Sequence, residues 1–244
     1  PSKGDQISIG YFRNFRKGVF ETSAEIYYKK VHNMLEYKNG AELLLNDAIE
    51  QDVLPSDLEA YGIELLFRRN AGRLTGWVSY TYSRSFLKTQ GSGSELIVPD
   101  GKNYPAYFDK PHDLSVVTSY KLSRRFTVSS SFTYNTGRPA TYPESGIMID
   151  NNYLVRYSER NKYRLRDYHR LDLSISWDTS IKRKKKYYSN WVLSVFNVYG
   201  RNNVYSTYYK KDIPTAKNDY KKYAFYELSI IGSPIPSLTY NLRF

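Results

Sequence analysis

The sequence contains no cysteine, and no apolar run in it approaches the roughly 20 residues that a membrane-spanning helix needs. The missing cysteine excludes disulfide frameworks and thiolate metal sites. Apolar residues at helical spacing are nearly absent too, so the sequence does not predict a helical fold. The three histidines, His32, His112 and His169, form no metal-ligand spacing signature, and no GxSxG nucleophile motif is present. We therefore expect no metal, no cofactor and no enzymatic activity.

Tyrosine carries much of the apolar surface of this chain. The 244 residues include 26 tyrosines, and 16% of all residues are aromatic, although the mean hydropathy is only −0.62. The apolar ring and polar hydroxyl of tyrosine suit a membrane–water interface. They also suit surfaces that recognise carbohydrate or protein, so the excess of tyrosine alone does not decide between these functions.

The chain is basic, with a formal net charge of +12, which raises nucleic acid as a partner. Lysine and arginine are nevertheless scattered over the sequence, and only KRKKK at 182–186 forms a dense cluster. We predict no nucleic-acid partner and interpret this cluster as a solvated basic turn near anionic lipid.

Alternation of apolar and polar residues is the dominant pattern, as in RLTGWVSYTYSRSF, PHDLSVVTSYKL and YHRLDLSISWD. One face of each strand carries most of the apolar and aromatic residues and the other is polar over about ten residues, which is typical of a membrane β-barrel with a wet lumen. We expect one set of residues to face lipid: Leu74, Val78, Tyr80, Leu114, Val116, Leu171, Leu173, Leu238, Tyr240 and Leu242. We expect a second set to face the lumen: Thr75, Ser115, Asp172, Ser174, Ser176 and Asn241.

The predicted strands are longer than those of soluble proteins, which average about 5–6 residues, and long enough for a membrane crossing of about 9–11 residues. They lie near 5–15, 19–36, 59–69, 73–88, 110–121, 126–137, 167–180, 189–209 and 225–244. Short connections (RKG, AG, LSRR and KRKKKYY) alternate with long ones (37–58, 89–109, 138–166 and 210–224). This alternation is the outer-membrane pattern, in which the short side is periplasmic and the long side extracellular.

The strand count predicts an incomplete barrel. About nine strands that begin and end in the same direction cannot close an all-antiparallel barrel, and bacterial single-chain barrels have an even number. The chain also opens on PSKGDQISIGYF, within an alternating pattern. We therefore expect further strands before Pro1 and interpret residues 1–244 as part of a larger protein.

Several motifs resemble TonB-dependent outer-membrane receptors of the Bacteroidetes type. They are AYFDKPHDLSVV, TYNTGRPATYP, RNKYRLRDYHRLDLSI, NVYGRNNVYSTYY and SPIPSLTYNLRF. The resemblance implies the C-terminal part, about nine strands, of a 22-stranded barrel, with the plug and the N-terminal strands absent from 1–244. It implies an energy-coupled uptake receptor in the outer membrane, whose partners are outer-membrane lipids and lipopolysaccharide, the remaining strands and plug, and the TonB complex. A non-transporting barrel that serves as a scaffold in a surface or secretion complex stays open as an alternative.

The sequence ends on PSLTYNLRF, an alternating strand with an aromatic last residue. In outer-membrane barrels such an ending resembles the signal that the barrel-assembly machinery reads. The resemblance assigns this signal to Tyr240, Leu242 and Phe244. The alternative is that Phe244 belongs only to an interfacial aromatic girdle.

Two further segments are candidates for binding. Arg160, Lys162, Arg164 and Arg166 lie in RNKYRLRDYHR, and they form either a patch for lipopolysaccharide phosphates or another anionic ligand, or a solvated loop base. The long segment 37–58 includes four aliphatic residues, Leu43, Leu44, Leu45 and Ile49. It either folds over the barrel mouth and contacts a surface lipoprotein partner, or forms a short helix on a neighbouring loop.

Overall fold

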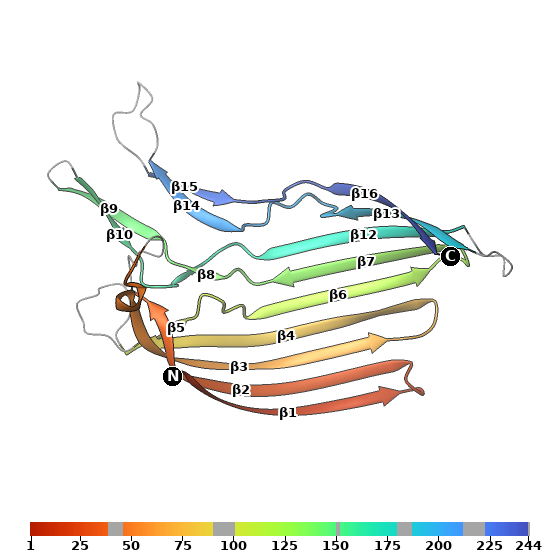
Figure 1. The fold of residues 1–244 in the computed structure, drawn as a ribbon, viewed down its shortest axis with the longest axis horizontal. Helices are drawn as coiled ribbons and strands as arrows, with labels where there is room; N and C mark the ends of the chain where they lie inside the picture. The colour runs from red at the N-terminus through yellow and green to blue at the C-terminus, as the bar shows by residue number, and fades with distance from the viewer. Residues whose placement is uncertain (39–45, 90–100, 150–151, 180–186, 212–222, 244) are drawn as a thin grey trace, which may run out of the picture. The chain divides into compact units, whose positions relative to one another are not determined.

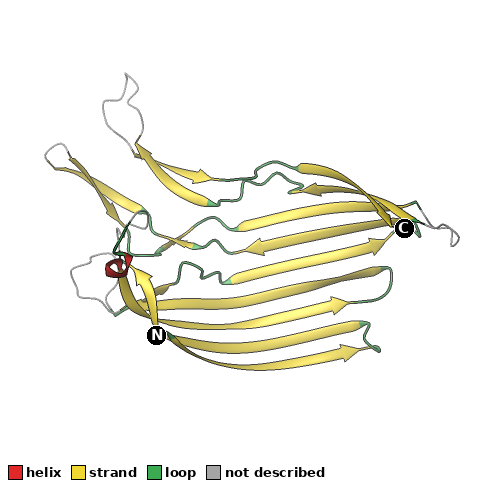
Figure 2. Cartoon of the chain, in the orientation of Figure 1, coloured by secondary structure: helices red, strands yellow, loops and turns green. Residues whose placement is uncertain are grey.

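The fold consists almost entirely of β-strands (Figures 1 and 2). The computed structural model describes residues 1–38, 46–89, 101–149, 152–179, 187–211 and 223–243. Its long strands are β1 (Lys3–Phe15), β2 (Phe20–Tyr37), β3 (Val53–Arg69), β4 (Leu74–Thr89), β6 (His112–Lys121), β7 (Phe126–Asn135), β12 (Tyr168–Asp178), β13 (Tyr188–Phe196) and β16 (Ile235–Arg243). Its shorter elements are the 3-10 turn η1 (Ile49–Asp52), β5 (Asn103–Pro105), β8 (Pro139–Ala140), β9 (Pro143–Ile149), β10 (Asn152–Tyr157), β11 (Tyr163–Arg164), β14 (Ser206–Lys211) and β15 (Tyr223–Leu228). Nothing helical in the described ranges has the length and apolar character to cross a membrane.

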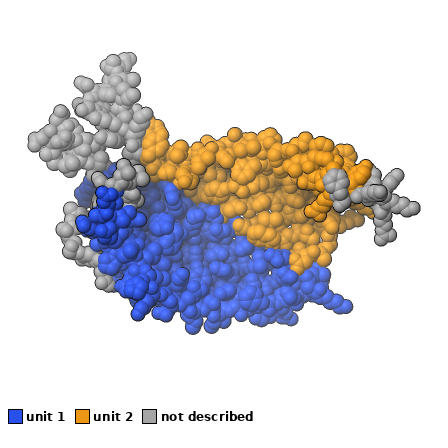
Figure 3. Space-filling view, viewed as in Figure 1, with its two compact units in different colours: residues 1–68, 78–114, 135–165 blue, residues 69–77, 115–134, 166–244 orange. Residues whose placement is uncertain are grey.

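The chain divides into two compact units (Figure 3). Unit 1 comprises residues 1–68, 78–114 and 135–165, and unit 2 comprises 69–77, 115–134 and 166–244. In unit 1 the strand order is β1-β2-β3-β4-β6, with β5 also pairing with β4; in unit 2 it is β4-β6-β7-β12-β13-β16. Within each unit the long connections leave the strands at one end, called here the long-loop end, and the short turns lie at the other, the short-turn end.

The predicted wall strands are present in the predicted order. Six of them, β1, β2, β4, β6, β7 and β12, match the expected ranges to within two residues at each end, and β3 begins six residues earlier than expected. Continuous strands over 189–209 and 225–244 were a wrong prediction, because β13 ends at Phe196 and β16 begins at Ile235. The outer parts of these two segments instead form a separate hairpin, β14–β15.

Two asparagines explain why β13 leaves the sheet. Asn197 takes a left-handed backbone (φ 53°) that ends the strand, and its buried side-chain amide binds the backbone of Arg201 at 3.1–3.2 Å. The side-chain amide of Asn203 then replaces the missing strand: it accepts from His169 N (3.1 Å) and donates to His169 O (3.0 Å). The backbone of β12 is thus satisfied without β13, as a buried peptide group requires.

Cross-strand registers in unit 2 separate an apolar face from a polar one. Trp177 pairs with Trp191 and Trp191 with Tyr240, while Leu193 pairs with Leu238. On the opposite face, hydroxyls and amides meet: Ser194 with Ser237 at 2.7 Å, and Asn190 with Asn241 at 2.9 Å. The predicted facing of Leu173, Leu238, Tyr240 and Leu242 against Asp172, Ser174, Ser176 and Asn241 is therefore present in β12 and β16.

Unit 1 repeats this separation. In the β1–β2 pair, Ile9 lies opposite Ile26 and Ile7 opposite Tyr28, with Ser8 and Gln6 turned to the other face. Ile9 and Ile26 are 68% and 52% exposed, so more than half of the surface of each meets no protein in the described residues. An exposed apolar face of this extent suits contact with lipid rather than with water.

The buried core among the described residues is small and lies at the long-loop end of unit 1. Leu58, Leu87, Tyr104 and Ala106 form it, and Val31 and Met34 pack against it. Compact side-chain packing is therefore concentrated where the long connections meet the wall.

Candidate functional site at the long-loop end

The segment 158–165, called here the strap, lies at the long-loop end of unit 1 and includes three of the four predicted binding cations. At its start Ser158, 1% exposed, exchanges backbone and side-chain hydrogen bonds with Tyr142 at 2.7 and 3.1 Å. At its end β11 pairs with β8, and Leu165 N donates to Arg138 O at 3.0 Å. The strap is thus fixed at both ends by regular backbone pairing.

Arg160 binds the end of β2. Its guanidinium pairs with the Glu36 carboxylate at 3.0 Å and also donates to the carbonyl of Tyr37. The two side chains are only 15% and 11% exposed, so this ion pair is largely shielded from solvent screening. The next residue, Asn161, reaches the end of β5 by donating from Nδ2 to Pro105 O at 2.8 Å.

Arg164 binds a buried carboxylate. Asp109, whose side chain is fully buried, accepts from Arg164, from Ser85 N (2.7 Å) and more weakly from Arg84 Nε (3.4 Å). Arg164 also donates to the carbonyls of Asp109 (2.8 Å) and Gly137 (3.0 Å). A buried charge held by two arginines and a peptide N–H is fully compensated, which is the condition under which such a charge is tolerated.

The other two predicted cations form more exposed pairs. Lys162 lies 2.9 Å from Glu144, and the Tyr163 hydroxyl donates to the same carboxylate at 2.9 Å. The hydrogen bonds from Lys162 and Tyr163 lower the pKa of Glu144, and Glu144 in turn raises the pKa of Lys162. In unit 2, Arg166 pairs with Glu227 on β15 while its side chain remains 61% exposed.

All four cations therefore contact a carboxylate from a distant part of the sequence. The basic cluster suggested a patch, but the acidic partners Glu36, Asp109, Glu144 and Glu227 were not predicted. Spacing could not have found these partners, because Arg164 and Arg166 lie 55 and 61 residues from Asp109 and Glu227. Binding of an anionic ligand by these cations stays a prediction.

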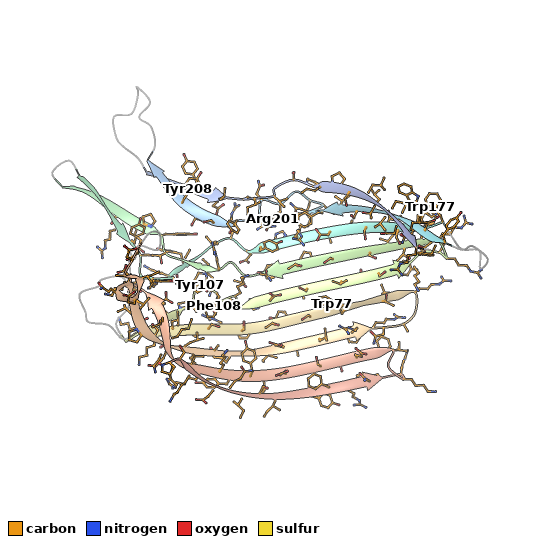
Figure 4. The ribbon with its side chains drawn as sticks, viewed as in Figure 1. Trp77, Tyr107, Phe108, Trp177, Arg201 and Tyr208 are labelled. Atoms are coloured by element: carbon orange, nitrogen blue, oxygen red, sulfur yellow. The ribbon has the colours of Figure 1, made fainter. Side chains whose placement is uncertain are left out.

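A chain of buried hydroxyls lies beneath the strap. Ser56 and Thr89 are 2.8 Å apart, and Thr89 is 2.6 Å from the Tyr104 hydroxyl. Burial raises the pKa of Tyr104. Exposed aromatic residues lie beside this core: Tyr107 and Phe108 make an edge-to-face pair at 5.0 Å (Figure 4).

Two of the three predicted assembly residues, Tyr240 and Leu242, lie at the short-turn end of unit 2. Tyr240 contacts Trp191 (ring centroids 4.7 Å) and Phe126 stacks on Trp177 (6.1 Å), so aromatic rings mark this end of the apolar face (Figure 4). Leu242 continues the same face opposite Ser189. Phe244, the KRKKK cluster and Leu43, Leu44 and Leu45 lie outside the described residues, and Ile49 lies in η1.

The histidines take part in rim contacts. His112 is 2.8 Å from the Tyr80 hydroxyl, His169 is 2.7 Å from that of Tyr199, and His32 is 3.1 Å from the Asp57 carboxylate. Within the described ranges, histidine, aspartate and glutamate form no group of three that could hold a metal ion.

Long antiparallel strands with one apolar face, one hydroxyl-rich face and aromatic rings at an edge define the wall of an outer-membrane β-barrel. A family model described as TonB-dependent receptor-like, β-barrel, matches residues 1–204. The chain belongs to this family of outer-membrane proteins. Assignment to the Bacteroidetes type stays a prediction.

Solved structures share this fold. The ferripyoverdine receptor of the Pseudomonas aeruginosa outer membrane, bound to ferripyoverdine, superposes with a TM-score of 0.57 at 18% identity, over 99% of this chain and 27% of that one. The ferric-catecholate import receptor Fiu of Escherichia coli gives 0.54 at 14% identity, over 84% and 24%. FpvAI in complex with pyocin S2 gives 0.55 at 18% identity, over 86% and 24%. No curated protein matches in sequence.

The chain spans about a quarter of the length of these structures. At such identities the similarity shows the fold.

Proposed function

We propose that residues 1–244 form part of the barrel wall of an energy-coupled uptake receptor, with the long-loop end in contact with the extracellular medium. The observation that carries this proposal is the family match over a wall whose two faces differ so sharply in polarity. An apolar outer face requires lipid, and a face lined by serine, asparagine and aspartate suits a wet or plug-filled lumen.

We further propose that this wall is the C-terminal part of a 22-stranded barrel. In the described residues β1 has one strand partner, β2, and β16 has one, β13. A strand edge with unpaired backbone groups is not stable in hydrocarbon. Additional strands must therefore cover both edges, and a plug with its TonB-contacting segment would come from the same larger protein.

Ferric siderophores are the first ligand class to test, because the similar structures include a ferripyoverdine receptor and a ferric-catecholate import receptor. The full-length protein would be produced in a host that lacks its own siderophore receptors, and uptake of iron-55 would be measured with a panel of ferric siderophores. Energy coupling predicts that a protonophore, or loss of TonB, abolishes accumulation but leaves surface binding intact.

The scaffold alternative predicts a different result. A scaffold would accumulate no ligand from a broad panel that includes cobalamin and oligosaccharides, and it would co-purify in stoichiometric amount with a surface or secretion complex. That pair of outcomes would overturn the uptake proposal.

A further inference from the structure

We propose that the strap, residues 158–165, locks three described segments of the long-loop end into one block, so that these segments move together or not at all. The inference rests on the proposed function, which places the long-loop end in contact with the extracellular medium. Three separate segments of unit 1 are joined by it: the end of β2, the turn 105–109 and the segment 137–142.

The first anchor is the shielded pair between Arg160 and Glu36. Because the Arg160 guanidinium also binds the Tyr37 carbonyl, it holds both a side chain and the backbone at the point where the first connection leaves β2. Movement of that connection away from the strap would leave a largely buried carboxylate without its partner, which is strongly unfavourable.

The second anchor is Arg164, whose guanidinium holds two segments at once. It binds the carboxylate and carbonyl of Asp109 in the turn after β5, and the carbonyl of Gly137 after β7. Asp109 is itself tied to β4 through Ser85 N. Separation of the strap from this turn would expose or orphan a carboxylate that is fully buried in the structure.

Asn161, which lies between Arg160 and Arg164, sets the direction in which the backbone of the strap turns. Asn161 has a left-handed backbone (φ 57°), donates from Nδ2 to Pro105 O and donates from its backbone N–H to Thr141 Oγ1 at 3.0 Å. This conformation turns the strap so that Arg160 and Arg164 reach different segments. The roles of the cations therefore divide: Arg160 and Arg164 act as positioning residues, and Lys162 and Arg166 lie in exposed pairs.

The experiment uses the full-length receptor in the outer membrane of intact cells, with Arg164→Met and Arg160→Met as test variants. Arg166→Met is the matched control, because it removes the same charge from the same motif but from a pair that is 61% exposed at the arginine. Cleavage of the long-loop side by an added protease is measured after normalisation to the assembled, heat-modifiable protein.

We expect cleavage on the order of tenfold faster in both test variants, because each leaves a buried carboxylate short of a partner and promotes local opening. Arg166→Met should stay close to the unchanged protein. If Arg164→Met does not assemble, Arg160→Met tests the strap alone, since it leaves the contacts of Asp109 intact.

Distances give a second measurement. Tyr107 and Tyr163 are exposed, and a pair of spin labels at Tyr107→Cys and Tyr163→Cys reports the separation of the turn from the strap. A locked block predicts one narrow distance distribution that Arg160→Met broadens. A broad distribution in the otherwise unchanged protein, or equal cleavage in all variants, would overturn the proposal whether or not the receptor transports a siderophore.

Discussion

Replacement of Ile9 by arginine tests whether the apolar face meets lipid. Ile9 lies on β1 opposite Ile26 and is 68% exposed. On the same face of the pair, charged residues flank it four positions away on each side, Asp5 and Arg13. Eight residues at a rise of about 3.4 Å and a tilt of about 40° span a height of about 20 Å. Ile9 is midway, so a charge placed there would lie near the bilayer midplane.

The expected magnitude follows from this depth. Arginine on the lipid face costs about 2–4 kcal/mol at the midplane and about 0–1 kcal/mol near an interface. At about 1.4 kcal/mol per tenfold change, the midplane cost lowers the folding equilibrium constant by roughly 30- to 700-fold. The neighbouring Ser8→Arg places the same charge on the opposite face of the same strand, where we expect little change. Both side chains are exposed in the structure, so the two variants differ mainly in the medium that each face meets.

The measurement is denaturant unfolding of the full-length receptor in phospholipid vesicles, followed by tryptophan fluorescence, together with the amount of heat-modifiable protein in native outer membranes. Ile9→Arg should lower both the unfolding midpoint and the assembled amount. An equal or larger loss for Ser8→Arg would refute the assigned facing and with it the membrane interpretation of unit 1.

Three further predictions concern backbone, assembly and completeness. Gly76→Ala should destabilise the wall by more than about 1 kcal/mol. Gly76 has φ +148°, and a Cβ added there would lie 2.1 Å from Val117 O, whereas a Cβ added at Gly4 would meet its nearest atom at an ordinary 3.5 Å. Equal melting temperatures for Gly76→Ala and Gly4→Ala would contradict this prediction. Leu242→Asp should reduce the assembled protein in the outer membrane more than Asn241→Asp, which adds the same charge on the opposite face; equal reductions would argue against recognition of this apolar face by the assembly machinery. Residues 1–244 refolded alone should give no sealed, heat-modifiable barrel, and a monodisperse barrel of this chain in detergent would show that its two edge strands can pair with each other.

The wall strands could be predicted from the sequence because the alternation of apolar and polar residues reflects the medium that each face meets. Trp177, Trp191 and Tyr240 fall on the apolar side of their strands and also pair across the sheet, since a period of two fixes the face whatever the partner is. Strand order followed from the alternation of short and long connections, because antiparallel neighbours joined by short turns lie side by side.

The interruptions after β13 and before β16 could not be predicted from this alternation. The pattern continues through NVYGRNNVYSTYY, but Asn197 ends β13 through its own left-handed backbone and amide contacts. Such local hydrogen bonds compete with strand pairing and leave no periodic signature.

The strap shows a second limit. Arg164 was visible as a cation, but its partner Asp109 is 55 residues away. Whether a cluster of arginines binds a ligand or holds loops together depends on carboxylates that only the fold brings near.

The side-chain amide of Asn203 makes the pairing of β12 independent of the hairpin β14–β15. Because that side chain satisfies the backbone of His169, the register of β12 does not depend on the length or the sequence of the hairpin β14–β15. We therefore expect the sheet to stay paired when residues are added or removed between β14 and β15. For an engineer, this hairpin is the place to graft a foreign peptide for display on the surface of a cell.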